Sequence, residues 1–276
     1  MDLVTLSRLN YKDVLRLQNS AKIADKLEKE WVRKISARIS GFTPELMKHL
    51  EKTGKPVAPD LEDLFCQHFF DVAIRSIRYA MRDTEIHTPL KKNTGLALPK
   101  PHIPESLKAL MRLYDLYRKK RYKPPRAVAQ AKKIKVEYLK RVSSVWEEHS
   151  HAFRTGDVAD QKAVVRSIQE EADTTASRAK TIVRTETTNG YNKARKQFYD
   201  QDDDVTHYLF IAIRDAATSP WCSPLTLNGY RGRSGLVYAK SDPRCDKERP
   251  ACHYGCRSEY LPLNRLNPAH LRFIQD

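Results

Sequence analysis

The spacing of the apolar residues is the feature of this chain that most limits its fold. Over residues 5–40 they recur every three or four positions, which places them on one face of an α-helix. Thr43 and Pro44 indicate a helix cap followed by proline at the first helical position. The same spacing predicts further helices over residues 43–52, 60–82, 104–122, 127–152 and from 157 to about 198.

Helical spacing ends at residues 202–204, and the rest of the chain predicts a small sheet. Residues 205–213 have the composition of a strand, and the candidate short strands or turns that follow are 225–230, 235–239 and 259–263. The sequence therefore predicts an α+β protein whose N-terminal two-thirds are mainly helical and whose C-terminal domain is small and rich in loops.

The predicted domain boundary lies between a basic helical region, residues 1–156, and a C-terminal α+β domain, residues 157–276. A proline-rich arm at residues 84–104 has no periodic pattern, and we expect it to be extended and exposed. Such an arm can reach a second copy of the chain, which would give self-association. An ordinary surface loop is the more frequent case for such a segment.

Basic residues dominate the charge of the chain: lysine and arginine number 50 against 34 aspartates and glutamates, for a formal net charge of +16. A basic surface attracts nucleic acid by releasing condensed counterions. Tyr114, Tyr117, Tyr122 and Tyr138 lie among the densest basic residues, a pattern that suits phosphate backbones but also a solvated helix face. The predicted nucleic-acid-binding residues are Arg118, Lys119, Lys120, Arg121, Lys123, Lys132, Lys133, Lys135, Lys140 and Arg141.

No apolar run reaches the length of a membrane span, and the N-terminus shows no secretory signal pattern. We therefore expect no membrane partner and synthesis in a reducing cytoplasm. In such a compartment the five cysteines are expected to be thiols or metal ligands before disulfides. Cys66, isolated from the others, is predicted to be a small buried hydrophobic residue.

Polar residues interrupt the apolar face of the last long helix at Arg184-Thr185-Glu186. Helical spacing continues the buried stripe from Val183 to Glu186 and then to Tyr191, so Glu186 is predicted to face inward. A buried carboxylate is costly unless it is paired. We expect its partner to come from the C-terminal region.

The segment from about 172 to 263 carries an ordered set of motifs. Arg184-Thr185-Glu186 is followed by Asp215, then Cys222, an Asn228-Gly229 turn and His253-Tyr254-Gly255-Cys256-Arg257. In this order the segment, about the last third of the chain, resembles the Mu F-like minor head proteins of tailed bacteriophages, the head morphogenesis family.

This chain departs from the family pattern at three positions. Leu225 stands where the family has the second cysteine of its first pair, Asn228 replaces the aspartate of the turn, and Ser258 replaces the last cysteine. Cys245 and Cys252 are additional thiols that could replace the missing ones.

The cysteines and the histidine of this segment form a candidate metal site. Thiolate and imidazole are the donors that structural zinc prefers, and zinc would stabilise a domain with a small core. Packed thiols without metal are the alternative interpretation. The candidate zinc ligands are Cys222, Cys245, His253 and Cys256, with Cys252 as an alternate.

Without metal, the polar residues of the signature are predicted to form a buried network that fixes the helix to the C-terminal segment. Its members are Arg184, Thr185, Glu186, Asp215, His253 and Arg257. A catalytic alternative uses Glu186 and His253 as acid and base with Asp215 orienting the histidine. We favour the structural network and predict no enzymatic activity.

The resemblance implies a virion protein inside the capsid at the portal vertex, which contributes to head assembly and to DNA packaging or ejection. The implied partners are the portal protein, the major capsid protein or scaffold, and phage double-stranded DNA contacted non-specifically. Two alternatives from other classes remain open: a zinc-dependent nucleic-acid-processing enzyme and a phage-delivered effector. The basic surface and the Cys/His cluster favour the first of these two, whereas no effector motif accompanies the signature.

Overall fold

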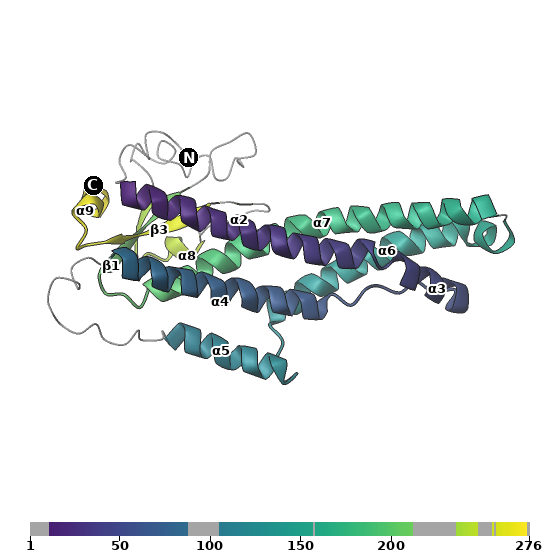
Figure 1. Ribbon diagram of the computed structural model, residues 1–276, viewed down its shortest axis with the longest axis horizontal. Helices are drawn as coiled ribbons and strands as arrows, with labels where there is room; N and C mark the ends of the chain where they lie inside the picture. The colour runs from purple at the N-terminus through teal and green to yellow at the C-terminus, as the bar shows by residue number, and fades with distance from the viewer. Residues whose placement is uncertain are drawn as a thin grey trace. The chain divides into compact units, whose positions relative to one another are not determined.

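The computed structural model describes residues 11–87, 105–156, 158–211, 236–247, 256 and 258–274. Within these residues the chain is mainly helical, with a small antiparallel sheet near the C-terminus (Figure 1). This confirms the α+β fold class predicted from the sequence. None of the described helices combines the length and the apolar character that crossing a membrane requires.

The helices follow the predicted ranges closely. Before the sheet they are α2 (Tyr11–Ser40), α3 (Thr43–Thr53), α4 (Glu62–His87), α5 (Glu105–Arg118), α6 (Pro125–Thr155) and α7 (Val158–Tyr199).

Two local expectations about these helices are corrected. Residues 84–87 belong to α4 rather than to an extended arm, while residues 88–104 lie outside the described part of the chain. The predicted threonine cap is wrong, because Phe42 is the N-cap of α3, no side chain caps it, and Thr43 is already helical.

The chain divides into two compact units that do not follow the predicted boundary at residue 156. Unit 1 comprises Met1–Leu27, Phe70–Tyr122 and Thr185–Asp276, and unit 2 comprises Glu28–Phe69 and Lys123–Arg184. Helices α2, α4 and α7 each contribute residues to both units. Each unit thus combines segments that are far apart in the sequence, and no single position in the sequence separates the two units.

Unit 2 buries the apolar stripes of its helices around large side chains. Ile35 and Tyr138 are both fully buried, and the Phe42 ring meets the Tyr138 ring edge-on at 6.3 Å. Burial of each large apolar side chain contributes about 1.5–3 kcal/mol. Gly54 ends α3 in the left-handed conformation, with φ at 68°, and its carbonyl accepts a hydrogen bond of 3.1 Å from the Trp146 indole.

His68 is the buried histidine of unit 2. Its ring lies 5.5 Å from Trp31 and 6.4 Å from Phe65, and only 3% of the residue is exposed. Burial among these rings lowers the pKa of His68 to about 3, since the charged imidazolium would lose its hydration. The folded protein therefore holds this histidine neutral at mildly acidic pH.

His68 gives unit 2 a specific dependence of stability on pH. Between the unfolded pKa of about 6.5 and the folded value near 3, the unfolded chain binds a proton that the folded chain does not, so stability falls as the pH falls. We expect His68→Gln to remove a component of up to about 1.4 kcal/mol per pH unit from the free energy of unfolding. Urea denaturation of both proteins between pH 4 and pH 8 measures it.

The control for this experiment is His151→Gln, the same substitution at an exposed position of α6. If the free energies of unfolding of wild type and His68→Gln differ by the same amount at every pH, the prediction is contradicted.

Unit 1 contains the sheet, whose strands are β1 (Val205–Ile211), β2 (Leu236–Ala239) and β3 (Glu259–Asn264) in the order β2-β1-β3. Both pairings are antiparallel, with Tyr208 opposite Tyr238 and Leu209 opposite Leu261. The predicted strands at 205–213, 235–239 and 259–263 match these elements, whereas 225–230 lies outside the described residues.

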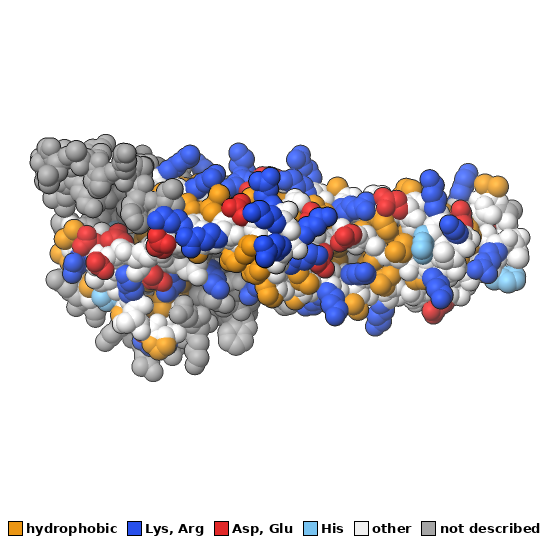
Figure 2. All heavy atoms as spheres, turned by 90° about the horizontal axis from the view of Figure 1, so that it is seen from below, with side chains coloured by type: hydrophobic (Ala, Val, Ile, Leu, Met, Phe, Trp, Pro, Cys, Tyr) orange, Lys and Arg blue, Asp and Glu red, His pale blue; other side chains and the backbone are white. Residues whose placement is uncertain are grey.

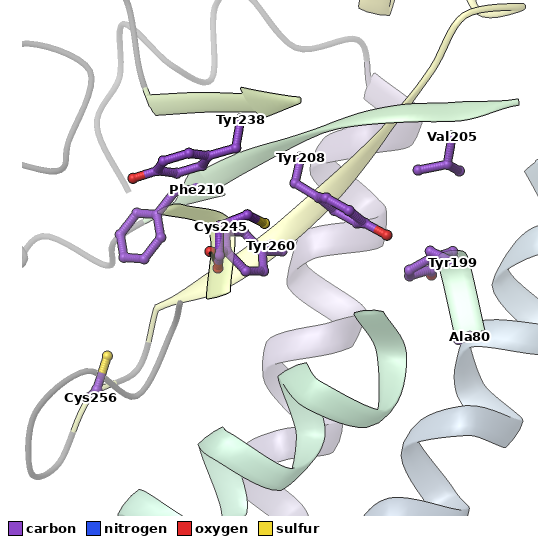
Figure 3. Packing of buried hydrophobic residues seen from close by; sticks show 9 residues of the cluster. All are labelled: Ala80, Tyr199, Val205, Tyr208, Phe210, Tyr238, Cys245, Cys256 and Tyr260. Carbon is purple, nitrogen blue, oxygen red and sulfur yellow. Dashed lines mark hydrogen bonds between the residues drawn. The ribbon is translucent and has the colours of Figure 1, made fainter. Parts of the chain in front are cut away.

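Both faces of the sheet are buried, which explains why the sequence of β1 is a nearly continuous apolar run. One face carries an aromatic cluster that includes Tyr208, Phe210 and Tyr260 and also Tyr199 of α7 (Figure 3). The other face carries an aliphatic cluster with Leu209, Ile211, Leu261 and Leu263, closed by Phe273 of α9 (Pro268–Ile274). Alternation with a period of two sends successive side chains to opposite clusters.

Helices α4 and α7 approach each other closely within unit 1. A Cβ atom placed on Gly190 would lie 3.2 Å from Cγ1 of Val72, tighter than an ordinary contact. Val72 also packs with Leu27 of α2 and Tyr191 of α7, all of them buried. Glycine at position 190 therefore allows the packing of these helices that places Tyr191 in the core.

Candidate functional site

The buried network predicted around the Arg184-Thr185-Glu186 motif stays a prediction, because only these three of its residues are described. The Arg184 side chain is half exposed and bonds Glu28 of α2 at 2.7 Å. Thr185 is buried, but Glu186 is only partly buried. The other predicted members, Asp215, His253 and Arg257, lie outside the described residues.

A different ionic cluster occupies the core of unit 1. Arg195 of α7, 3% exposed, donates from Nη1 to Glu259 Oε2 of β3 at 3.1 Å and to Ser20 Oγ of α2 at 2.7 Å. The Ser20 hydroxyl in turn donates to the Glu259 carboxylate and lies 3.0 Å from the Tyr191 hydroxyl. This cluster connects Ser20 with Arg195, 175 residues later in the sequence, and Arg195 with Glu259, a further 64 residues later.

Aromatic rings surround the buried guanidinium. The Arg195 Cζ atom lies 5.1 Å from the centre of the Tyr191 ring and 5.7 Å from those of Tyr79 and Tyr199. The ring faces carry partial negative charge and stabilise the cation where water is excluded. The same burial raises the pKa of Tyr191 above its ordinary value, so its hydroxyl stays protonated.

The periodicity that directed attention to Glu186 could have found Arg195. Arg195 lies one helical turn beyond Tyr191, on the buried face of α7, so the same spacing argument places it inward. Nothing in the sequence identifies Glu259 or Ser20 as its partners, because their proximity arises from the tertiary fold.

Asn192 blocks the outer edge of β3. Its side-chain amide donates to the Ser258 carbonyl at 3.1 Å and accepts from the Tyr260 N–H at 3.3 Å, as a neighbouring strand would. Farther along the same edge, Pro262 has no N–H, and the Asn264 N–H donates to His270 Nδ1 at 2.9 Å. The edge therefore offers no donor at these alternate positions to a further strand.

These contacts make the Arg195 cluster a structural lock rather than a reactive centre. Its polar groups bond one another inside a shell of packed rings, and a buried ion pair of this kind is sensitive to loss of either partner. The catalytic alternative with Glu186, Asp215 and His253 stays open, because Asp215 and His253 lie outside the described residues.

The lock predicts strong coupling between Arg195 and Glu259. We expect Arg195→Met or Glu259→Gln alone to lower the free energy of unfolding by about 3–5 kcal/mol, because each leaves a buried charge without its partner. The double variant Arg195→Met/Glu259→Gln should be more stable than the sum of the single losses predicts. Guanidinium unfolding of the four proteins measures the coupling, and additive losses would refute the lock.

The described cysteines are all buried. Cys245 and Cys256 are each 1% exposed and belong to the aromatic cluster of the sheet (Figure 3). Cys66 is fully buried, which confirms that prediction, and burial raises the pKa of its thiol to about 11.

Zinc binding stays a prediction. No group of three or more His, Cys, Asp or Glu side chains within the described residues is arranged to hold a metal ion. Cys222, Cys252 and His253, which the predicted site needs, lie outside those residues.

Nine of the ten predicted nucleic-acid-binding residues fall into two groups, and the tenth, Lys133, is exposed. Lys123 is in an ion pair with Glu62, and Arg141 bonds Glu171 at 2.9 Å and Glu137 at 3.3 Å. Others are exposed and form no ion pair within the described part of the chain: Arg118, Lys119, Lys120, Arg121, Lys132, Lys135 and Lys140. Figure 2 shows lysine and arginine side chains across one face, with fewer acidic ones between them.

The tyrosines among these basic residues pack against other rings of the protein. Tyr138 is fully buried in unit 2, which excludes a role in base stacking. The same burial raises its pKa to about 12. Tyr114, Tyr117 and Tyr122 pack against Phe70 of α4 at ring distances of 5.2, 5.3 and 6.4 Å. The sequence pattern had suggested contacts with nucleic acid for all four tyrosines.

An open groove of about 720 Å³ lies along α6 and α7 in unit 2. Its two arginines are paired within the groove, because Glu137 accepts bonds from both Arg141 and Arg178, the latter at 2.8 Å, and Glu171 accepts another from Arg141. Lys140 lines the same groove and remains exposed without an ion pair in the described residues. The positive charge available to a polyanion here therefore comes from Lys140 rather than from the arginines.

Comparisons with protein-family models, with curated proteins and with solved structures found no match to this chain.

Proposed function

We propose that this chain is a non-enzymatic minor head protein of a tailed bacteriophage that contacts double-stranded DNA without sequence preference. The observation that carries the DNA contact is the set of exposed lysines and arginines without ion-pair partners in the described residues. Charges already neutralised by carboxylates add little to polyanion binding, whereas each unpaired cation can replace a counterion on a phosphate.

The place of the protein in the head rests on the ordered motifs of residues 172–263 and their resemblance to Mu F-like minor head proteins. The expected location is the capsid interior at the portal vertex, after synthesis in the host cytoplasm. The expected partners are the portal protein and the major capsid protein or scaffold. The Arg195 lock suits an anchor in such an assembly, because it fixes β3 to α7 and α2.

The lysines of α6 provide the first test. We expect the logarithm of DNA affinity to fall linearly with the logarithm of salt concentration. Lys132→Glu/Lys135→Glu/Lys140→Glu should reduce that slope by about 0.9 for each phosphate that the variant no longer neutralises. Fluorescence anisotropy with a short duplex of arbitrary sequence measures both the affinity and the slope.

The matched control reverses three other exposed lysines of unit 2, Lys48, Lys52 and Lys55, which also form no ion pair within the described residues. An equal loss of DNA affinity in this control would count against a DNA-binding surface on α6. A salt slope that neither set of substitutions changes would count against it as well.

The head location has a separate test. Mass spectrometry of virions and of empty procapsids, purified from the phage that encodes this chain, should detect the protein in both, and crosslinking should join it to the portal protein. Its absence from both particles would refute the proposed role, whatever the DNA-binding result.

A further inference from the structure

Lys120 adopts a backbone conformation that lysine seldom takes. Its φ is 57°, and within the described residues no other non-glycine residue has a positive φ. It lies just beyond the end of α5, where its N–H bonds the Tyr117 carbonyl and the Arg121 N–H bonds the Leu116 carbonyl, both at 2.8 Å. This pair of bonds is the Schellman motif, whose left-handed position is usually glycine.

The lysine at this position raises the free energy of the folded protein. A left-handed backbone brings the Cβ atom of an L-residue close to the following carbonyl, a cost that glycine avoids. Strained backbone of this kind is found where the side chain has a function that outweighs the reduced stability. The side chain of Lys120 is exposed and supports no described packing, so its charge is the property that glycine could not supply.

Aromatic packing fixes both ends of the turn that contains Lys120. Tyr117, just before it, and Tyr122, just after it, both contact the ring of Phe70, which is 1% exposed. Tyr114 stacks on Tyr117 at 6.1 Å and extends the same cluster. The turn at residues 118–121, here called the basic turn, is therefore held in one position on unit 1.

Each residue of the basic turn is a cation, and each is exposed. None of them forms an ion pair within the described residues. The negative end of the α5 dipole favours nearby cations, and Arg118 in the last helical turn already meets that preference. The dipole therefore does not explain why position 120 retains a lysine.

We propose that the basic turn is a contact site for the phosphates of double-stranded DNA, and that Lys120 keeps its strained conformation for that contact. This inference rests on the proposed function and assigns part of its DNA contact to unit 1. A dense row of cations without an apolar side chain suits phosphates, whereas the centre of a protein interface requires apolar or aromatic anchors. A fixed turn also loses little conformational entropy when it binds.

Substitution of Lys120 separates charge from strain. We expect Lys120→Gly to raise the midpoint of thermal unfolding by about 2–4 °C and to reduce the salt slope of duplex binding by about 0.9. Lys120→Arg keeps both the charge and the strain, so its slope and melting temperature should match wild type. Lys162→Gln, which removes one exposed charge from α7, should leave the slope unchanged.

The outcomes distinguish this site from the general proposal. If wild type binds duplex DNA without salt dependence, the proposed DNA contact itself fails. If the α6 variant reduces the slope but Lys120→Gly does not, only the basic turn is wrong. A lower melting temperature for Lys120→Gly would refute the strain argument, and competition by poly-glutamate equal to that by DNA, charge for charge, would reassign the turn to acidic protein.

Discussion

The buried ion pair between Arg195 and Glu259 is the interaction on which the architecture of unit 1 depends. A charge taken out of water must find its compensation in the protein, and here the compensation comes from another helix and from a strand. Because Ser20 joins the same pair, α2, α7 and β3 hold one arrangement. The sheet consequently has a fixed place on its helices, and Asn192 closes the outer edge of β3.

Ion pairing also distinguishes the cations that bond carboxylates within the fold from the exposed cations that could bind a ligand. Arg141, for example, is paired with Glu171 within the fold. Lys132, Lys135 and Lys140 of α6 and the residues of the basic turn form no ion pair within the described residues. Net charge alone does not make this distinction. The structure thus places exposed cations without ion pairs on both units, among them Lys132, Lys135 and Lys140 in unit 2 and the basic turn in unit 1.

The tyrosines show how an aromatic pattern in a basic segment can have two physical meanings. A ring beside lysines can stack on bases, or it can pack inside the protein and hold the lysines in place. Tyr117 precedes the basic turn and Tyr122 follows it, and both pack against the ring of Phe70. These two rings therefore have the second role. In the proposed DNA contact these rings act indirectly, through the position of the cations between them.

Apolar periodicity determined the helices and the strands by itself, because burial of one face is a local property of each segment. Neither the division into units nor the partner of Arg195 follows from that pattern, since both depend on residues brought together from distant segments. Helical spacing places both Glu186 and Arg195 on the inner face of α7, but Glu186 is partly buried whereas Arg195 is buried. Only packing decides how far each polar residue of a helical face is enclosed. Tertiary structure likewise decided which cations stay unpaired and that Lys120 lies in a left-handed turn.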